Sequence, residues 1–252
     1  MKNQTIIGGL SRTLRSLSHP ITNAGQFSTK KMRNLYDFDT NRRSLPEVDK
    51  RALSLFVVEC LLPIVGVHPY PMDEQLLMCS AVAYFKPDII MEWGTHKGHS
   101  ARIFREAVNY CGLSAQLHSI DLPPNAAHEE NIRNAKMRGC LIKGMDVQLH
   151  LGDGLATAIS ILAQARKSAV QDKLPMFFLD GDHAYESVKR ELDGVREFCT
   201  KAVVLIHDTF YQSPEANYNV GPHQAVQEFT RFHNLPLYTT ALGLPGMSLT
   251  WW

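Results

Sequence analysis

The sequence predicts an α/β fold with a mostly parallel sheet of seven strands, one of them antiparallel, helices on both faces and a helical cap before the first strand. Two observations lead to this prediction. Five short apolar runs alternate with segments of helical periodicity, and two further strand-like runs near the end of the chain are joined by the turn Gly243–Gly246. Alternation of strands and helices is typical of parallel sheets, whereas a short turn joins antiparallel neighbours.

The first predicted strand covers residues 88–91 and leads through a glycine turn into a helix. The run is long enough for a buried strand and too short for a helix, and it ends in Glu92. The turn Gly94–Gly98 follows, and helical spacing begins at Ser100. In this layout backbone N–H groups and a helix N-terminus meet a ligand. The dinucleotide pattern GxGxxG is absent, so a ligand with positive charge or hydroxyl groups is favoured over a pyrophosphate.

The other elements follow from the same periodicities. Further buried strands are predicted over residues 115–120, 147–151, 176–179 and 202–206, and a terminal pair over 237–242 and 247–251. Helices are predicted over residues 45–67, 73–84, 131–140, 155–170, 187–198 and 224–232. Pro63 is expected to end or kink the first helix, and Asp73 to cap the second. The polar stretch 211–223 is interpreted as a surface loop or lid.

Acidic residues follow each predicted parallel strand. They are Glu92, Asp121, Asp153, Asp180 and the pair His207-Asp208. The carboxyl ends of parallel strands meet at one edge of the sheet, where ligands of open α/β folds bind. Asp121 follows a strand–helix–strand unit, the place at which a ribose diol is commonly bound, although an aspartate that merely ends a strand would look the same.

The fourth and fifth strand ends carry the densest set of ionisable groups. Oxygen and imidazole ligands for one divalent cation could come from Asp180, Asp182, His183, His207 and Asp208. The alternative is that the aspartates cap the segments that follow and the histidines satisfy buried polar groups. His183 is the candidate general base, because an unperturbed imidazole titrates near neutral pH.

The motif EWGTHKGHSA at residues 92–101 resembles the first motif of class I S-adenosylmethionine (SAM)-dependent methyltransferases, in which an acid precedes Gly-x-x-x-Gly. The form is similar to the branch of macrolide-sugar O-methyltransferases and cephalosporin hydroxylase-like proteins, and the resemblance covers roughly residues 70–252. It implies the Rossmann-like methyltransferase fold and an enzyme that methylates a hydroxyl of a sugar or natural product.

The same resemblance implies roles for the residues at the strand ends. The residues expected to bind SAM are Glu92, Gly94, Thr95, Gly98, Ser100, Asp121, Asp153, Gly154 and Asp180. Asp180, His207 and Asp208 match the positions of metal ligands, with Mg²⁺ or Mn²⁺ as the expected ion, and Asp180 and His183 are the expected catalytic residues. The His-Asp pair departs from the two acids, or acid and amide, that are usual there. Magnesium prefers oxygen, so the identity and presence of the metal stay open.

Three rival functions stay open at this point. A non-catalytic SAM-binding protein would keep the fold and lose the chemistry. A nicotinamide-dependent oxidoreductase on a related fold is disfavoured by the missing GxGxxG. Methylation of nucleic acid is disfavoured because the net charge is +1 and no basic patch follows the N-terminal region.

Chain length, hydropathy and cysteine content predict the domain organisation and the cellular location. The chain of 252 residues is long enough for one α/β domain at 45–252 (cap 45–86, core 87–252) and a basic extension at 1–44. No apolar run reaches the length of a membrane span, and the five scattered cysteines are typical of reduced thiols. We therefore expect a cytoplasmic enzyme for a small-molecule hydroxyl substrate, with homo-oligomerisation suggested by the family. Residues 1–36 contain no acid, so a mitochondrial transit peptide remains the alternative.

Overall fold

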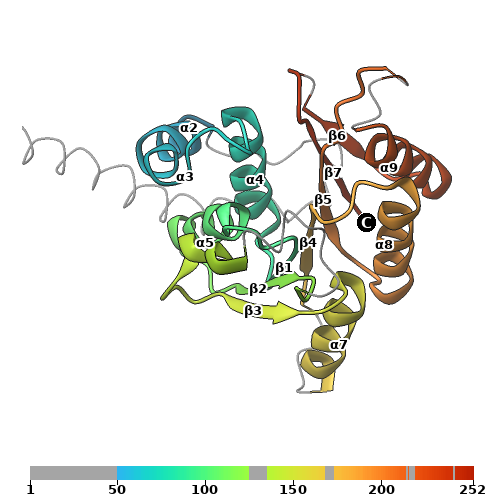
Figure 1. Cartoon of the computed structure of the whole chain (residues 1–252), viewed down its shortest axis with the longest axis horizontal. Coiled ribbons are helices and arrows are strands. Elements are labelled where there is room, and N and C mark those ends of the chain that lie inside the picture. The colour runs from blue at the N-terminus through green and yellow to red at the C-terminus, as the bar shows by residue number, and fades with distance from the viewer. Residues whose placement is uncertain (1–49, 125–134, 168–172, 214, 216–218, 241) are drawn as a thin grey trace, which may run out of the picture.

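The computed structural model describes residues 50–124, 135–167, 173–213, 215, 219–240 and 242–252 (Figure 1). The predicted N-terminal extension therefore lies outside the described residues. So do parts of the helices predicted over residues 131–140 and 155–170. The division of the chain at residue 44 stays a prediction.

Seven strands form a single sheet in the order β3-β2-β1-β4-β5-β7-β6. Five are parallel: β1 (Ile89–Trp93), β2 (Gln116–Asp121), β3 (Gln148–Leu151), β4 (Pro175–Leu179) and β5 (Val203–His207). The strand β7 (Met247–Trp251) runs antiparallel to both β5 and β6 (Leu237–Thr239). These pairings confirm the predicted mostly parallel sheet with one antiparallel strand. Parallel neighbours are joined by crossover connections, whereas β6 and β7 are joined by a short turn.

Helices cover both faces of the sheet and create two hydrophobic cores (Figure 1). On one face α4 (Met72–Phe85) and α5 (His99–Tyr110) cover Ile90, Phe178 and Leu205 among other strand side chains. On the other face α7 (Gly154–Lys167), α8 (Tyr185–Phe198) and α9 (Val220–His233) cover Ile89, Met91 and Trp93. Successive strand residues point to opposite faces, so the central strands are apolar on both faces except near their carboxyl ends, where Glu92 and His207 lie.

The helical cap before β1 consists of α4 and, ahead of it, one helical segment with a change of pitch. That first segment comprises α2 (Lys50–Phe56), a π-helical turn η1 (Val57–Leu61) and α3 (Leu62–Val65). The N–H of Leu62 bonds to the carbonyl of Val57, five residues back, directly before Pro63. Since proline has no N–H and its ring crowds the preceding turn, the wider turn lies where the prediction places a disruption.

Several local predictions need correction. Asp73 lies inside the first turn of α4, whose N-cap residue is Pro71, so it does not cap that helix. Within the described part of residues 131–140, the helix is replaced by the 3₁₀ turns η2 (Ala135–Met137) and η3 (Cys140–Ile142). The helix α9 begins at Val220, which shortens the predicted loop at 211–223. None of the described helices is long and apolar enough to cross a membrane.

Candidate active site

A cleft of about 720 Å³ opens at the carboxyl edge of the parallel strands. The strand register explains why: Trp93 of β1 pairs with both Ile120 and Leu179, so the chain leaves β1, β2 and β4 at one level. Most of the residues predicted to bind SAM or a metal line this cleft, namely Gly94, Thr95, Ser100, Asp121, Asp153, Gly154, Asp180, His207 and Asp208. Glu92 and Gly98 do not line it.

The glycine turn after β1 passes directly against the end of β4. Gly94 has a φ of +90°, and a Cβ at this position would lie 2.2 Å from the carbonyl oxygen of Asp180. Only glycine fits, for reasons of both conformation and space. Gly98 has a different role, since its missing Cβ makes room for Ile142 of η3.

Glu92 lies behind the glycine turn, on the face of β1 covered by α4 and α5. It is 1% exposed, and its Oε1 accepts a hydrogen bond from Ser119. Its Oε2 is buried without a hydrogen-bond partner among the described residues. Burial raises the pKa of Glu92 to about 8, despite hydrogen bonds from Ser119 and Ser100 that act to lower it. The position fits a role in supporting the turn or in meeting a cationic ligand.

The acids after β2 and β3 line the cleft but already have partners. Asp121 accepts a hydrogen bond from Arg138 at 2.7 Å. Asp153 accepts one from Arg190 at 2.7 Å and one from the N–H of Ala156 at 2.9 Å, which caps α7. Each carboxylate oxygen has more than one lone pair, so these contacts leave room for a ligand. Their roles at the ribose and the adenine stay predictions.

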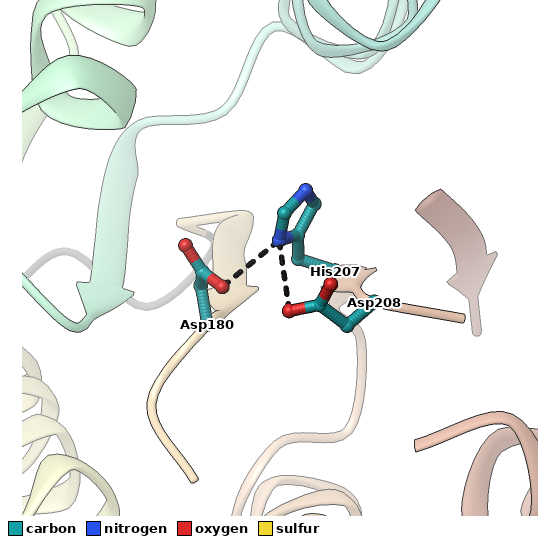
Figure 2. Close-up of side chains that lie close together, drawn as sticks. All are labelled: Asp180, His207 and Asp208. Carbon is teal, nitrogen blue, oxygen red and sulfur yellow. Dashed lines mark hydrogen bonds and ion pairs between the residues drawn. The ribbon is translucent and has the colours of Figure 1, made fainter. Parts of the chain in front are cut away.

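Three side chains converge where β4 and β5 end. Leu179 pairs with Ile206, so the next residues, Asp180 and His207, stand side by side. Nδ1 of His207 lies 3.0 Å from Oδ1 of Asp180 and 3.3 Å from Oδ2 of Asp208 (Figure 2). One ligand atom from each residue lies within 4.8 Å of the other two. We call these three residues the Asp–His–Asp cluster.

The comparisons with known proteins agree with this architecture. Residues 91–209 match the family model described as a methyltransferase domain. The match begins inside β1 and ends just after the Asp–His–Asp cluster, so the residues that build the cleft wall lie almost entirely within it.

Two solved structures share the fold of this chain. CalS11, described as a TDP-rhamnose 3′-O-methyltransferase of calicheamicin biosynthesis, is 17% identical with a TM-score of 0.51, over 92% of this chain and 94% of that one. The cofactor-bound protein Rv0187 from MTB is 14% identical with a TM-score of 0.51, over 88% and 96%. These likenesses confirm the predicted Rossmann-like methyltransferase fold. No curated protein matches the sequence.

Two residues before the matched segment contact the Asp–His–Asp cluster. Glu74, 1% exposed on α4, places its Oε2 3.0 Å from Nε2 of His207. Tyr70 donates a hydrogen bond of 2.5 Å to Oδ2 of Asp180. Glu74 was not among the predicted site residues. In the sequence it is marked only as an acid on an otherwise apolar face of a predicted helix.

These contacts set the charge state of the cluster. Burial acts to raise the pKa of Asp180, but His207, His183 and Tyr70 together hold it well below its ordinary value. Burial acts to lower the pKa of His207, and its carboxylate neighbours, Asp180 foremost, raise it well above 6.5. The carboxylates around His207 therefore favour the protonated form of its ring.

His183 lies at the mouth of the cleft with its side chain 35% exposed. Its Nε2 is 3.0 Å from Oδ2 of Asp208 and 3.9 Å from Oδ1 of Asp180. These carboxylates raise the pKa of His183 to about 10, so the ring holds a proton at neutral pH in this arrangement. Only a neutral imidazole can accept a proton, so His183 can act as the general base only when Asp180 and Asp208 bind another group. The role of His183 as the base stays a prediction.

The residues of the Asp–His–Asp cluster fit a divalent cation. Two carboxylates and one imidazole nitrogen face one point, and Oδ1 of Asp208 is buried without a hydrogen-bond partner among the described residues. Asp182, the other acid considered as a ligand, bonds to the N–H of Ala184 and the hydroxyl of Ser187 at the start of α8. These contacts tie Asp182 to the turn before α8.

Proposed function

We propose that the chain is a SAM-dependent O-methyltransferase that acts on a hydroxyl group of a small molecule with the help of a divalent cation. One observation carries this proposal: the Asp–His–Asp cluster lines the same cleft as the glycine turn that would hold the cofactor. The structural similarity to CalS11, described as a TDP-rhamnose 3′-O-methyltransferase, supports a sugar or a related polyhydroxylated compound as the acceptor. A cytoplasmic location and homo-oligomerisation remain predictions.

The cofactor would lie along the strand ends. Gly94, Thr95 and Ser100 would surround its methionine end, with Glu92 behind them, while Asp121 would accept the ribose hydroxyls and Asp153 the adenine amino group. The indole of Trp93 packs so closely on Gly154 that a Cβ there would overlap it, so the wall of the adenine end is flat. A flat apolar wall beside polar acceptors suits a purine ring.

Methyl transfer to oxygen requires an aligned and deprotonated hydroxyl. The acceptor oxygen forms a bond to the methyl carbon while the bond from that carbon to sulfur breaks, and the hydroxyl proton leaves. A cation held by the Asp–His–Asp cluster would lower the pKa of the hydroxyl and fix its oxygen in line with the methyl group. His183 would accept the proton once it is neutral. Tyr70 holds Asp180 in place through its hydroxyl group.

The test separates cofactor binding from chemistry. A thermal-shift panel of SAM, S-adenosylhomocysteine, NAD and NADP should show stabilisation by the first two alone. At a hundred times Kd this is about 2.7 kcal/mol, or roughly 5–10 °C for a domain of this size. Asp180→Ala should abolish turnover and leave S-adenosylhomocysteine affinity, measured by calorimetry, within about threefold of wild type.

A matched control is Asp193→Ala, which removes an exposed aspartate paired with Lys189 on α8, outside the cleft. It should leave binding and turnover unchanged. If Asp180→Ala loses cofactor affinity in parallel with activity, the role of Asp180 is wrong. Stabilisation by NAD instead of SAM would overturn the proposed function as a whole.

A further inference from the structure

We propose that Glu74 is a positioning residue that holds His207 as an Nδ1 metal ligand, and that the site therefore prefers a transition metal such as Mn²⁺ or Co²⁺ to Mg²⁺. The proposal rests on the cation site of the proposed function and deepens it. Glu74 lies outside the matched methyltransferase segment, on the helical cap.

Both oxygens of the Glu74 carboxylate are engaged by separate parts of the fold. Oε1 accepts a hydrogen bond of 2.7 Å from the N–H of Gly246, in the turn between β6 and β7. Oε2 lies 3.0 Å from Nε2 of His207, at the end of β5. The side chains of Glu74 and His207 are 1% and 4% exposed, so water does not compete for these contacts. The carboxylate is thus fixed behind the imidazole ring.

This geometry decides which nitrogen of the ring can bind a metal. A carboxylate accepts hydrogen bonds and cannot donate them, so Nε2 carries a proton toward Glu74. The other nitrogen, Nδ1, faces the oxygens of Asp180 and Asp208, as Figure 2 shows. Metal-binding histidines commonly donate their second ring N–H to a carboxylate, which fixes the tautomer and the direction of the ring. Glu74 matches that arrangement.

An amide cannot replace the carboxylate of Glu74. The N–H of Gly246 and the Nε2–H of His207 are both donors, and an amide offers one acceptor oxygen and one donor NH₂. In Glu74→Gln, an NH₂ group that faces His207 would force the proton onto Nδ1 and remove the ligand. An NH₂ group that faces Gly246 would set two donors against each other. The isosteric variant therefore disturbs the metal site with little change in volume.

The donor set predicts the metal. Mg²⁺ favours oxygen ligands in near-ideal octahedral geometry, whereas imidazole raises affinity for later divalent ions. A cluster of two carboxylates and one imidazole nitrogen, held rigidly from behind, should bind Mn²⁺ more tightly than Mg²⁺ and Co²⁺ more tightly still. His207 is the residue that gives the site this preference, and Glu74 keeps it in place.

The experiment measures metal binding directly on the metal-free full-length protein. Calorimetric titrations with Mg²⁺, Mn²⁺ and Co²⁺ should show at least roughly tenfold tighter binding of the last two. Pulsed electron paramagnetic resonance of the Mn²⁺-loaded protein should detect a nitrogen coupling from the imidazole. In Glu74→Gln the affinity for Mn²⁺ and Co²⁺ should fall roughly 10- to 100-fold, while that for Mg²⁺ changes little.

Glu191→Gln is the control for loss of a buried carboxylate, because Glu191 is 5% exposed in the same cleft but outside the Asp–His–Asp cluster. It should keep the preference for Mn²⁺ and the nitrogen coupling. If Glu74→Gln does not fold, His207→Asn still tests the metal preference. It removes the imidazole ligand and leaves an amide N–H that can donate a hydrogen bond to Glu74. That variant should lose the nitrogen coupling and the preference for Mn²⁺.

Equal affinity of the wild-type protein for Mg²⁺ and Mn²⁺, or absence of nitrogen coupling, would overturn the preference. Unchanged metal affinities in Glu74→Gln would overturn the positioning role. S-adenosylhomocysteine binding is measured in parallel to tell this failure from that of the proposed function. A protein that binds S-adenosylhomocysteine and ignores all three metals refutes the metal claim alone, whereas one that binds neither refutes the methyltransferase function as well.

Discussion

Substitution of Gly94 by alanine tests whether the cleft depends on the close approach of the β1 turn to β4. The added Cβ would lie 2.2 Å from the carbonyl oxygen of Asp180, so one of the two backbones must move. The positive φ of +90° adds a conformational cost of about 1–2 kcal/mol, and overpacking adds about 1–3 kcal/mol. We expect a loss of about 2–5 kcal/mol in the free energy of unfolding.

Gly144→Ala provides a matched control. Gly144 has a φ of +78°, and a Cβ there meets nothing within 4 Å. This variant should lose only the conformational part, about 1–2 kcal/mol. The difference between the two variants isolates the contact with Asp180.

Urea unfolding and calorimetric binding of S-adenosylhomocysteine measure the two effects. Because the displaced turn lines the cleft in which we propose the cofactor binds, Gly94→Ala should also bind S-adenosylhomocysteine at least roughly tenfold more weakly, which is about 1.4 kcal/mol. Gly144→Ala should bind normally. Equal stability losses in the two variants, together with equal binding, would refute the steric reasoning and the placement of the cofactor at Gly94.

The other predictions concern the response to pH. Burial raises the pKa of Glu92 to about 8, so ionisation of this group penalises the folded state; the penalty is small near pH 4.5 and complete above pH 8. Glu92→Gln should therefore increase stability little at pH 5 and by an amount on the order of a few kcal/mol at pH 9 in urea unfolding, and a difference independent of pH would contradict this. His183, with a pKa raised to about 10, should stay protonated at pH 7.5 in metal-free protein, as followed by NMR of the imidazole ring. Its stabilising contribution is complete below pH 6.5 and is lost as pH rises through 10; in Asp208→Asn the pKa should return toward 6.5, and an unshifted value would show that Asp208 is not the cause.

Local pattern was enough to predict the fold. Each apolar run from β1 to β5 is followed by an acid or by a histidine–acid pair. Helical periodicity follows β1, β3 and β4, where the helices α5, α7 and α8 form. Such signals depend on neighbours in sequence. The sequence pattern was less informative at η2 and η3, where a helix was predicted and 3₁₀ turns formed. Gly139 and Gly144 there both have a positive φ, which interrupts helical structure.

The candidate site was predicted only in part. The convergence of Asp180 and His207 follows from strand polarity, since adjacent parallel strands end at one level. The protonation of His183 was not predictable, because it depends on distances to two carboxylates that sequence spacing does not give. The same is true of the contact between Arg138 and Asp121.

By itself the sequence determined the sheet, its edge and the acids along that edge, because strand period and turn residues are local properties of the chain. Only the tertiary structure decided which side chains contact the residues at the strand ends. Glu74 meets His207 across 133 residues and Gly246 across 172, and Tyr70 meets Asp180 across 110. Contacts over such separations arise when the helical cap packs on the sheet. The protonation of the Asp–His–Asp cluster and the orientation of the His207 ring therefore depend on this packing and cannot be predicted from local sequence.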